Sequence, residues 1–236
     1  MIVTPIRTRV FREGEDLFEF LDEALPLIRD RSIVAVTSKI VALSERRTAE
    51  IENEKTKEEW IRRESEYVVR GKYTWLSLKD GVVLSSAGID ESNANGKLIL
   101  LPRDSFRSAE NIRAYLQERF GVKNIGVIVT DSRAVLLRAG AIGMAVGYAG
   151  FSGLKEYCGK PDIFGRILRF ERVNIADSLA VSAVLTMGEG DEQQPIAIVE
   201  DAPVTFSQEV LRDELLIDIE EDLYRPFFSK FPFRNK

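Results

Sequence analysis

Histidine is absent from the 236-residue chain, and Cys158 is its single cysteine. Without an imidazole there is no Ser-His-Asp or Cys-His catalytic group and no histidine-bound zinc. One cysteine forms neither an intrachain disulfide nor a thiolate metal cluster, which suits a reducing compartment. Catalysis must therefore use carboxylates, lysine, arginine, hydroxyls or backbone amides. These groups suit Mg²⁺ or Mn²⁺ beside phosphates, because hard cations prefer oxygen ligands.

Strong net charge and long apolar runs are also missing. The formal net charge is −5, from 38 acidic and 33 basic residues, so nothing indicates a basic surface for nucleic acid or an anionic membrane. The longest uncharged stretch, residues 139–154, is shorter than a membrane span and contains five glycines. Met1 is followed at once by strand-like sequence, which predicts no signal peptide. We therefore expect a cytoplasmic protein that binds neither nucleic acid nor membranes.

Hydrophobic periodicity predicts a mixture of helices and strands. Helices are predicted behind Asp16, with Pro26 kinking or ending the first one, and then over residues 56–69 and 105–120, with Gly121 as C-cap. Lys79-Asp80-Gly81 predicts a hairpin turn. The predicted strands are residues 2–11, 32–38, 73–78, 82–86, 97–101, 125–130 and 195–199. Because hairpin signals replace a regular βαβ rhythm, the predicted fold class is α+β.

Oxygen-bearing side chains gather at the ends of three apolar segments. Asp90 lies in the segment 87–96, Asp131 and Ser132 follow the run 125–130, and Glu189 lies in the segment 187–194. Each segment alone is typical of a turn, because Asp, Asn and Gly favour turns. If the three converge, they form a site for a hard cation and a phosphate ester.

The familiar phosphate-binding motifs are missing. The chain has no Walker-type sequence and no Gly-x-Gly-x-x-Gly after a strand; Gly188-x-Gly190 comes nearest. Lys39, at the predicted end of the strand 32–38, is either a solvated lysine or a point charge for a phosphate. Arg138, beside the glycine-containing stretch, favours anion binding over an ordinary surface role.

Several ordered motifs resemble the coenzyme F420-0:L-glutamate ligase family, the GTP-dependent γ-glutamyl ligases of the deazaflavin coenzyme F420. Each motif is weak by itself, but their order and spacing are specific. They are Val36-Thr37-Ser38-Lys39, Ala87-Gly88-Ile89-Asp90-Glu91-Ser92-Asn93, Val129-Thr130-Asp131-Ser132, Gly147-Tyr148-Ala149-Gly150, Asp162-Ile163-Phe164-Gly165-Arg166, Ala176-Asp177-Ser178-Leu179-Ala180 and Met187-Gly188-Glu189.

The resemblance implies roles for individual residues. Asp90 and Asp131 match ligands of one divalent metal, and Ser132 and Glu189 match ligands of a second. Asp90, Asp131 and Arg138 are the expected catalytic residues. The residues that match the guanine-nucleotide contacts are Thr8, Arg9, Val10, Phe11, Ser38, Lys39, Asn93, Met187, Gly188, Gly190, Asp191, Glu192, Gln193 and Gln194.

The resemblance also implies an overall organisation and a set of partners. Residues 1–200 would form the catalytic region, as two subdomains with a boundary near residues 70–80, and residues 201–236 an acidic extension packed on the same unit. The expected ligands are two Mg²⁺ or Mn²⁺ ions, K⁺ as a further cation, GTP, L-glutamate and a small-molecule carboxylate acceptor. The expected assembly is a homodimer, and the expected activity is that of an amide-forming, GTP-dependent ligase.

Two departures from the family pattern leave the acceptor open. Leu43 replaces a second nucleotide-binding lysine, and residues 132–138 read Ser-Arg-Ala-Val-Leu-Leu-Arg where the family commonly reads Thr-Phe-Gly-Arg-Pro-Trp-Arg. The acceptor is therefore either coenzyme F420-0 or a folate or other pterin. A non-catalytic nucleotide-binding homologue is the further alternative.

Overall fold

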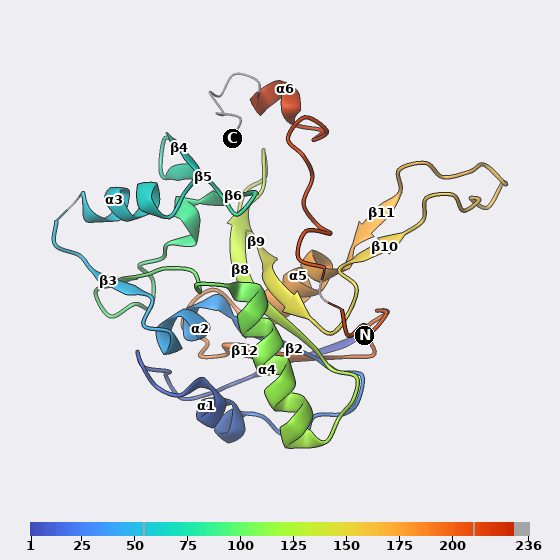
Figure 1. Cartoon of the computed structure of the whole chain (residues 1–236). Coiled ribbons are helices and arrows are strands. Elements are labelled where there is room, and N and C mark those ends of the chain that lie inside the picture. Colours follow the sequence, from blue (N-terminus) through green and yellow to red (C-terminus); the bar gives the residue numbers. More distant parts are fainter. Residues whose placement is uncertain (54, 210, 229–236) are drawn as a thin grey trace.

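A five-stranded mixed sheet forms the centre of the computed structural model, which describes residues 1–53, 55–209 and 211–228 (Figure 1). The strand order is β1-β12-β2-β8-β9. β2 and β8 run parallel, and the other neighbouring pairs are antiparallel. The strands are β1 (Ile2–Ile6), β2 (Ile33–Thr37), β8 (Gly126–Ala134), β9 (Ala141–Ala149) and β12 (Ile196–Glu200).

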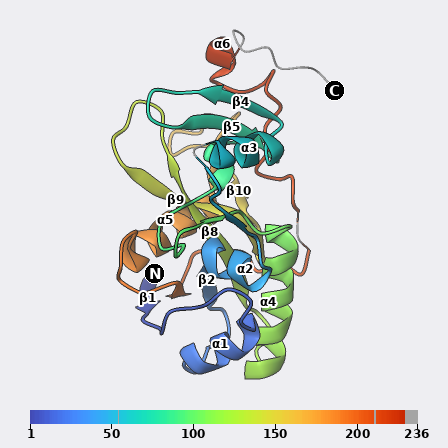
Figure 2. The ribbon, with the colours of Figure 1, turned by 90° about the vertical axis from the view of Figure 1, so that its left-hand side faces the viewer.

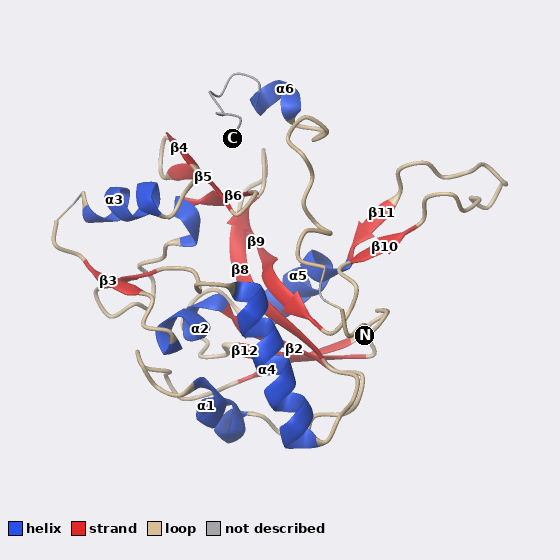
Figure 3. Cartoon of the chain, viewed as in Figure 1, coloured by secondary structure: helices blue, strands red, loops and turns tan. Residues whose placement is uncertain are grey.

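Helices cover both faces of this sheet (Figure 3). The first face carries α1 (Leu17–Ala24), α2 (Ser38–Ser44) and α4 (Ser105–Phe120), and the second carries α5 (Ile175–Met187). Alternate residues of β2 and β8 point to opposite faces, so these two strands are buried on both sides. Val34 and Val127 pack under the first group of helices, whereas Ile33 and Ile128 pack toward α5.

The chain between α2 and α4 forms a smaller unit at one end of the main sheet (Figure 2). It has its own core, in which Ile61, Trp75 and Leu98 are buried. The expected boundary near residues 70–80 falls inside its three-stranded sheet, and the division into subdomains stays a prediction. The elements are β3 (Thr48–Glu50), α3 (Thr56–Arg63), β4 (Tyr67–Arg70), β5 (Trp75–Lys79), β6 (Val82–Ser85), the 3₁₀ turn η1 (Ser86–Gly88) and β7 (Lys97–Ile99).

Two further segments extend from the main sheet. The strands β10 (Leu154–Glu156) and β11 (Arg172–Asn174) form the base of an arm, residues 154–174, that projects from the body (Figure 1). After β12, the C-terminal extension crosses the core and ends its described part with α6 (Arg225–Phe228). Residues 229–236 of the predicted extension lie outside the described residues.

The structure confirms the α+β class and several local predictions. α4 begins behind the N-cap Asp104 and ends at Gly121, whose φ is 65°. The β5–β6 turn places Asp80 and Gly81 at φ 51° and 75°, as an Asp-Gly hairpin requires. Among the described helices, none has the length and apolar character needed to cross a membrane.

Three predicted elements are wrong in extent or type. The helix predicted over 56–69 ends at Arg63, and residues 67–70 instead form β4, because the β-branched pair Val68-Val69 joins the ladder of β5. The first strand ends at Ile6 and not at residue 11. Ser38 and Lys39 do not end a strand but begin α2, which follows β2 without a loop.

Candidate functional site

A left-handed turn places Asp90 on the loop between the smaller unit and the main sheet. Ser86, Ala87 and Gly88 all have positive φ, at 51°, 56° and 71°. This conformation is costly for residues with a side chain and persists only where the surroundings enforce it. The buried Ser77 hydroxyl accepts the Ala87 N–H at 2.7 Å and thereby holds the turn. Beyond the turn, Asp90 exchanges backbone hydrogen bonds with Ile99.

The Asp90 carboxylate is surrounded by donors. Oδ1 accepts the backbone N–H of Ser92 at 2.7 Å, and Oδ2 accepts the Ser92 hydroxyl and the Lys39 ammonium, both at 2.8 Å. Burial favours a higher pKa for Asp90, but the Lys39 and Ser92 bonds outweigh it and hold the pKa below its ordinary value. Asp90 is therefore an anion that Lys39 neutralises.

Asp131 lies where β8 passes the end of its parallel neighbour. β2 pairs with β8 up to Thr37 and Thr130, and beyond this point β8 continues against β9. Burial, together with the negative charges of Asp90 and Glu189, raises the pKa of Asp131 to about 7, although the Ser132 N–H opposes this shift. Because the charges of Asp90 and Glu189 act on Asp131, the three carboxylates lie in one region.

The segment after α5 reaches the same region. The Thr37 N–H donates to the Pro195 carbonyl at 2.9 Å, which fixes the end of this segment beside β2. The Thr8 N–H donates to the Gln193 carbonyl at 2.9 Å, and the Asn93 side-chain amide donates to the Gly190 carbonyl at 3.0 Å. The structure thus brings together residues 8, 38–39, 90–93, 131–132 and 188–195 at the carboxyl ends of β2 and β8.

Other predicted site residues lie in the core or bind elsewhere. Phe11 packs edge-on against Phe20 in the main core, and Met187 is buried beside β2 and β12. Arg9 forms ion pairs with Glu15 and Glu23, at 2.7 and 2.8 Å. Val10 is exposed, as are Asp191, Glu192 and Gln193, whereas Gln194 is half-buried.

Two further positions matter to the comparison with the family pattern: Arg138, which the pattern keeps, and Leu43, which departs from it. Arg138 lies on the exposed turn between β8 and β9. Leu43 packs with Ala42, Ala94 and Ile99, where an apolar side chain replaces the lysine of the family pattern.

The carboxylates fit a cation that arrives with a polyphosphate. Across the described residues, no three His, Cys, Asp or Glu side chains form a ready metal-binding group. Mg²⁺, however, commonly takes only one or two protein carboxylates and completes its shell with waters and substrate phosphates. Asp90 and Asp131, which lie close enough to perturb each other, meet that requirement.

Sequence reasoning missed the residues whose hydrogen bonds hold the elements of this site in position. Asp177 accepts the Ala145 N–H at 3.0 Å and pairs with Arg133 at 3.3 Å, which ties α5 to the hairpin that carries Ser132. The available signal was Asn174-x-x-Asp177, a helix start in which Asn174 caps the Asp177 N–H. The role of Ser77 left no such signal, because its partner Ala87 lies ten residues away.

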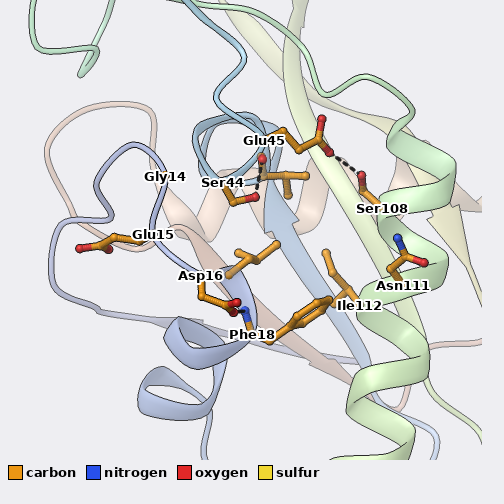
Figure 4. A pocket seen from close by; sticks show the side chains of 11 residues that line it. Gly14, Glu15, Asp16, Phe18, Ser44, Glu45, Ser108, Asn111 and Ile112 are labelled. Carbon is orange, nitrogen blue, oxygen red and sulfur yellow. Dashed lines mark hydrogen bonds between the residues drawn. The ribbon is translucent and has the colours of Figure 1, made fainter.

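A cavity of about 370 Å³ lies at the other end of α2, between α1 and α4 (Figure 4). Its acidic residues already have partners. Glu45 accepts the Ser108 hydroxyl and the Arg103 N–H, and Asp16 caps α1 through the Phe18 and Glu19 N–H groups. None of the carboxylates of the candidate site lines this cavity.

The fold and the site together define an α+β protein whose carboxylates, lysine and glycine-containing loop meet at strand ends without a P-loop. The family model described as F420-0:Gamma-glutamyl ligase matches residues 5–201, and the chain belongs to this family.

The relatives that the chain matches are named as L-glutamate ligases of coenzyme F420. The chain is 41% identical over 147 residues to the "Coenzyme F420:L-glutamate ligase" of Methanococcus maripaludis strain C6, a match that spans 62% of this chain and 58% of that protein. Proteins with the same name in Archaeoglobus fulgidus and Methanopyrus kandleri are 32% and 34% identical. Those matches span 92% of both chains for the first, and 82% of this chain and 83% of the relative for the second.

Proposed function

We propose that the protein is a GTP- and divalent-metal-dependent ligase that attaches L-glutamate to coenzyme F420-0. The observation that carries the proposal is the convergence of Lys39, Asp90 and Asp131 with the loop of residues 187–194 at the carboxyl end of β2. The family and the names of the relatives support the ligase chemistry. The acceptor carboxylate takes the γ-phosphate of GTP, and the glutamate amine then displaces phosphate from the acyl phosphate.

Each part of the site has a place in this reaction. Asp90 and Asp131 would hold one divalent ion and Ser132 and Glu189 a second, and such ions would supply positive charge beside the transferring phosphoryl group. The loop 187–194 and the N–H groups beside Thr8 bind the nucleotide. Because the chain has no histidine, catalysis rests on positioning and electrostatic stabilisation.

The direct test is an assay of purified protein with GTP, Mn²⁺, L-glutamate and F420-0. We expect GDP and phosphate in equal amounts with a glutamylated product. A folded protein that makes no GDP with any γ-glutamyl acceptor would instead support a non-catalytic nucleotide-binding homologue. Calorimetry that shows tight GDP binding under the same conditions would establish that alternative.

A folate or other pterin is the second candidate acceptor. The segment after Ser132 exposes Leu136 and Leu137, with Leu137 fully exposed, where the family commonly has a Pro-Trp pair beside an arginine. This change alters the surface next to the carboxylates. If tetrahydrofolate is consumed at least as fast as F420-0 in a competition assay, the deazaflavin acceptor is wrong and the ligase chemistry remains.

A second copy of the chain is the proposed protein partner. The arm of residues 154–174 exposes Ile163, Phe164 and Phe170, each with more than four-fifths of its side chain accessible. Large apolar side chains grouped on a projecting arm are typical of a protein–protein interface. Light scattering on the purified chain should give the mass of a dimer, and Phe164→Ser combined with Phe170→Ser should shift it toward the monomer.

A further inference from the structure

The ammonium of Lys39 has no donor left for another ligand. An ammonium group has three N–H donors and no acceptor. Nζ lies 2.8 Å from Asp90 Oδ2, 3.0 Å from Ser92 Oγ and 3.1 Å from the Ser92 carbonyl oxygen. All three donors are therefore used within the loop that carries Asp90.

The same contacts occupy most of the acceptor sites of the Asp90 carboxylate. Oδ2 already accepts the Lys39 ammonium and the Ser92 hydroxyl, and Oδ1 accepts the Ser92 N–H. Oδ1 keeps one free lone pair, so a divalent ion on Asp90 either binds there beside the ammonium or replaces the ammonium on Oδ2. Two cations at one carboxylate repel each other, and water screens this repulsion only in part because the Lys39 side chain is 24% exposed. Replacement is therefore favoured over sharing.

The backbone of Lys39 is fixed within α2, whereas its side chain is flexible. Lys39 is the second residue of α2, which follows β2 directly and packs Ile40 and Val41 into the main core. The lysine side chain is a flexible four-carbon stem. Once released from Asp90, its ammonium swings about this fixed base toward whatever anion lies before the start of α2 and the loop 188–195.

We propose that Lys39 is a built-in counter-ion of Asp90 that a divalent cation displaces, which frees the ammonium to bind the phosphates of the nucleotide. The identity of the two ligands rests on the proposed function. In this arrangement the metal-free site is self-neutralised, and the metal prepares the nucleotide site. Metal and nucleotide then bind cooperatively, each strengthening the other by the same factor.

The first experiment measures Mn²⁺ binding without nucleotide, by electron paramagnetic resonance of the free ion. Lys39→Met removes the competing ammonium, and Lys39→Gln repeats the change with a polar side chain. The matched control is Lys57→Met, since Lys57 pairs at 2.9 Å with Glu91, the neighbour of Asp90, and this variant deletes the same charge without opening Asp90. We expect the Mn²⁺ affinity to rise about fivefold in both Lys39 variants. The control should change less than about twofold, because Lys57 pairs with Glu91 and does not occupy an oxygen of Asp90.

The second experiment measures GDP binding by calorimetry with and without Mn²⁺. Without the ion, wild type and Lys39→Met should bind GDP equally, because Lys39 is engaged with Asp90. With the ion, the variant should bind GDP more weakly, so that the coupling between the two ligands shrinks. Equal GDP affinity of the two proteins in Mn²⁺ would overturn the inference.

Two further outcomes of the first experiment also overturn it. If the Lys39 variants bind Mn²⁺ more weakly than wild type, Lys39 positions Asp90 and does not compete with the ion. If the Lys39 and Lys57 variants change the Mn²⁺ affinity equally, the affinity depends only on the net positive charge near the site and not on the contact between Lys39 and Asp90. If the wild-type protein binds no Mn²⁺, with or without GDP, the metal dependence in the proposed function is wrong as well. This outcome distinguishes failure of the proposed function from failure of the inference alone.

Discussion

Asp90 and Asp131 are single residues from distant parts of the chain that act on each other. The Lys39 ammonium lowers the pKa of Asp90, while burial and neighbouring carboxylates raise that of Asp131. In this pair, the charged form of Asp90 is therefore stabilised and the charged form of Asp131 is disfavoured. A shared cation would stabilise the charged form of Asp131 and take the place of Lys39 on Asp90.

Asparagine at either position should abolish GTP turnover. Each of Asp90→Asn and Asp131→Asn removes an anionic oxygen that holds the ion beside the polyphosphate. The double variant should be no worse than the single variants, because the two residues act as a unit. The control is Asp80→Asn in the β5–β6 turn, where Asn is an equally good turn residue and turnover should persist. Full activity of either single variant at limiting Mn²⁺ would remove the metal assignment.

Asp131→Asn should also stabilise the metal-free protein, and more so as the pH rises. The folded-state pKa of about 7 lies above the ordinary carboxyl value, so the folded protein loses stability as the pH climbs between those values. The variant lacks this penalty. Thermal melts in a chelator should therefore show a gain on the order of 1 kcal/mol or more at about pH 8 and little gain at about pH 4. A gain independent of pH would contradict this account.

At the scale of elements, the left-handed turn η1 connects the smaller unit to the candidate site. Its two non-glycine residues, Ser86 and Ala87, are buried in a costly conformation that the surrounding strands enforce. The position of Asp90 therefore depends, through this turn, on the position of β5.

Removal of the Ser77 hydroxyl should loosen this turn. Ser77→Ala leaves the Ala87 N–H without its acceptor, which costs about 1–3 kcal/mol when the donor stays buried. We expect a lower melting temperature and weaker Mn²⁺ binding, because Asp90 is held less firmly. Ser65→Ala, just after α3 in the same unit, deletes a hydroxyl that donates to the Ile61 carbonyl away from the turn and should leave Mn²⁺ binding intact. Unaltered Mn²⁺ affinity in Ser77→Ala would show that Ile99 alone positions Asp90.

At the scale of the whole molecule, the C-terminal extension is bound to the core by buried contacts. Glu214 Oε1 accepts the Tyr148 hydroxyl at 2.7 Å and the Gly153 N–H at 2.6 Å. Burial and the Glu214 carboxylate both raise the pKa of Tyr148, so its hydroxyl stays protonated and donates. Arg212 adds an ion pair at 2.7 Å to Asp104, the N-cap of α4.

Loss of the Glu214 carboxylate should destabilise the entire fold. Glu214→Ala leaves two donors without their acceptor and should cost about 1–3 kcal/mol. Chemical denaturation should still show one transition, because the extension and the core unfold together. The exposed Glu209→Ala serves as the control and should be neutral. A separate early transition in Glu214→Ala would mean that the extension is independent of the core.

The sequence predicts long elements with clear ends better than short ones. α4 is predictable because Asp104 and Gly121 mark its two ends. α2 is not, since its seven residues follow β2 without a loop and its helical state depends on the packing of Ile40 and Val41. The merged helix over 56–69 shows the same limit, because Tyr67 and Val68 also fit helical spacing until β5 pairs with them.

The candidate site is likewise predictable from the sequence only in part. Its carboxylates are recognisable from the motifs in which they lie. The bond between Lys39 and Asp90 is not, because it joins residues 51 positions apart whose meeting depends on the placement of the smaller unit.

The early end of β2 has a consequence for recognition. Beyond Thr130, β8 pairs only with β9 among the described strands, so one edge of its backbone lies open beside Asp131 and Ser132. An open strand edge binds an extended molecule through its own N–H and carbonyl groups, whatever its side chains are. We therefore expect side-chain substitutions at Arg133 and Ala134 to leave such backbone contacts in place.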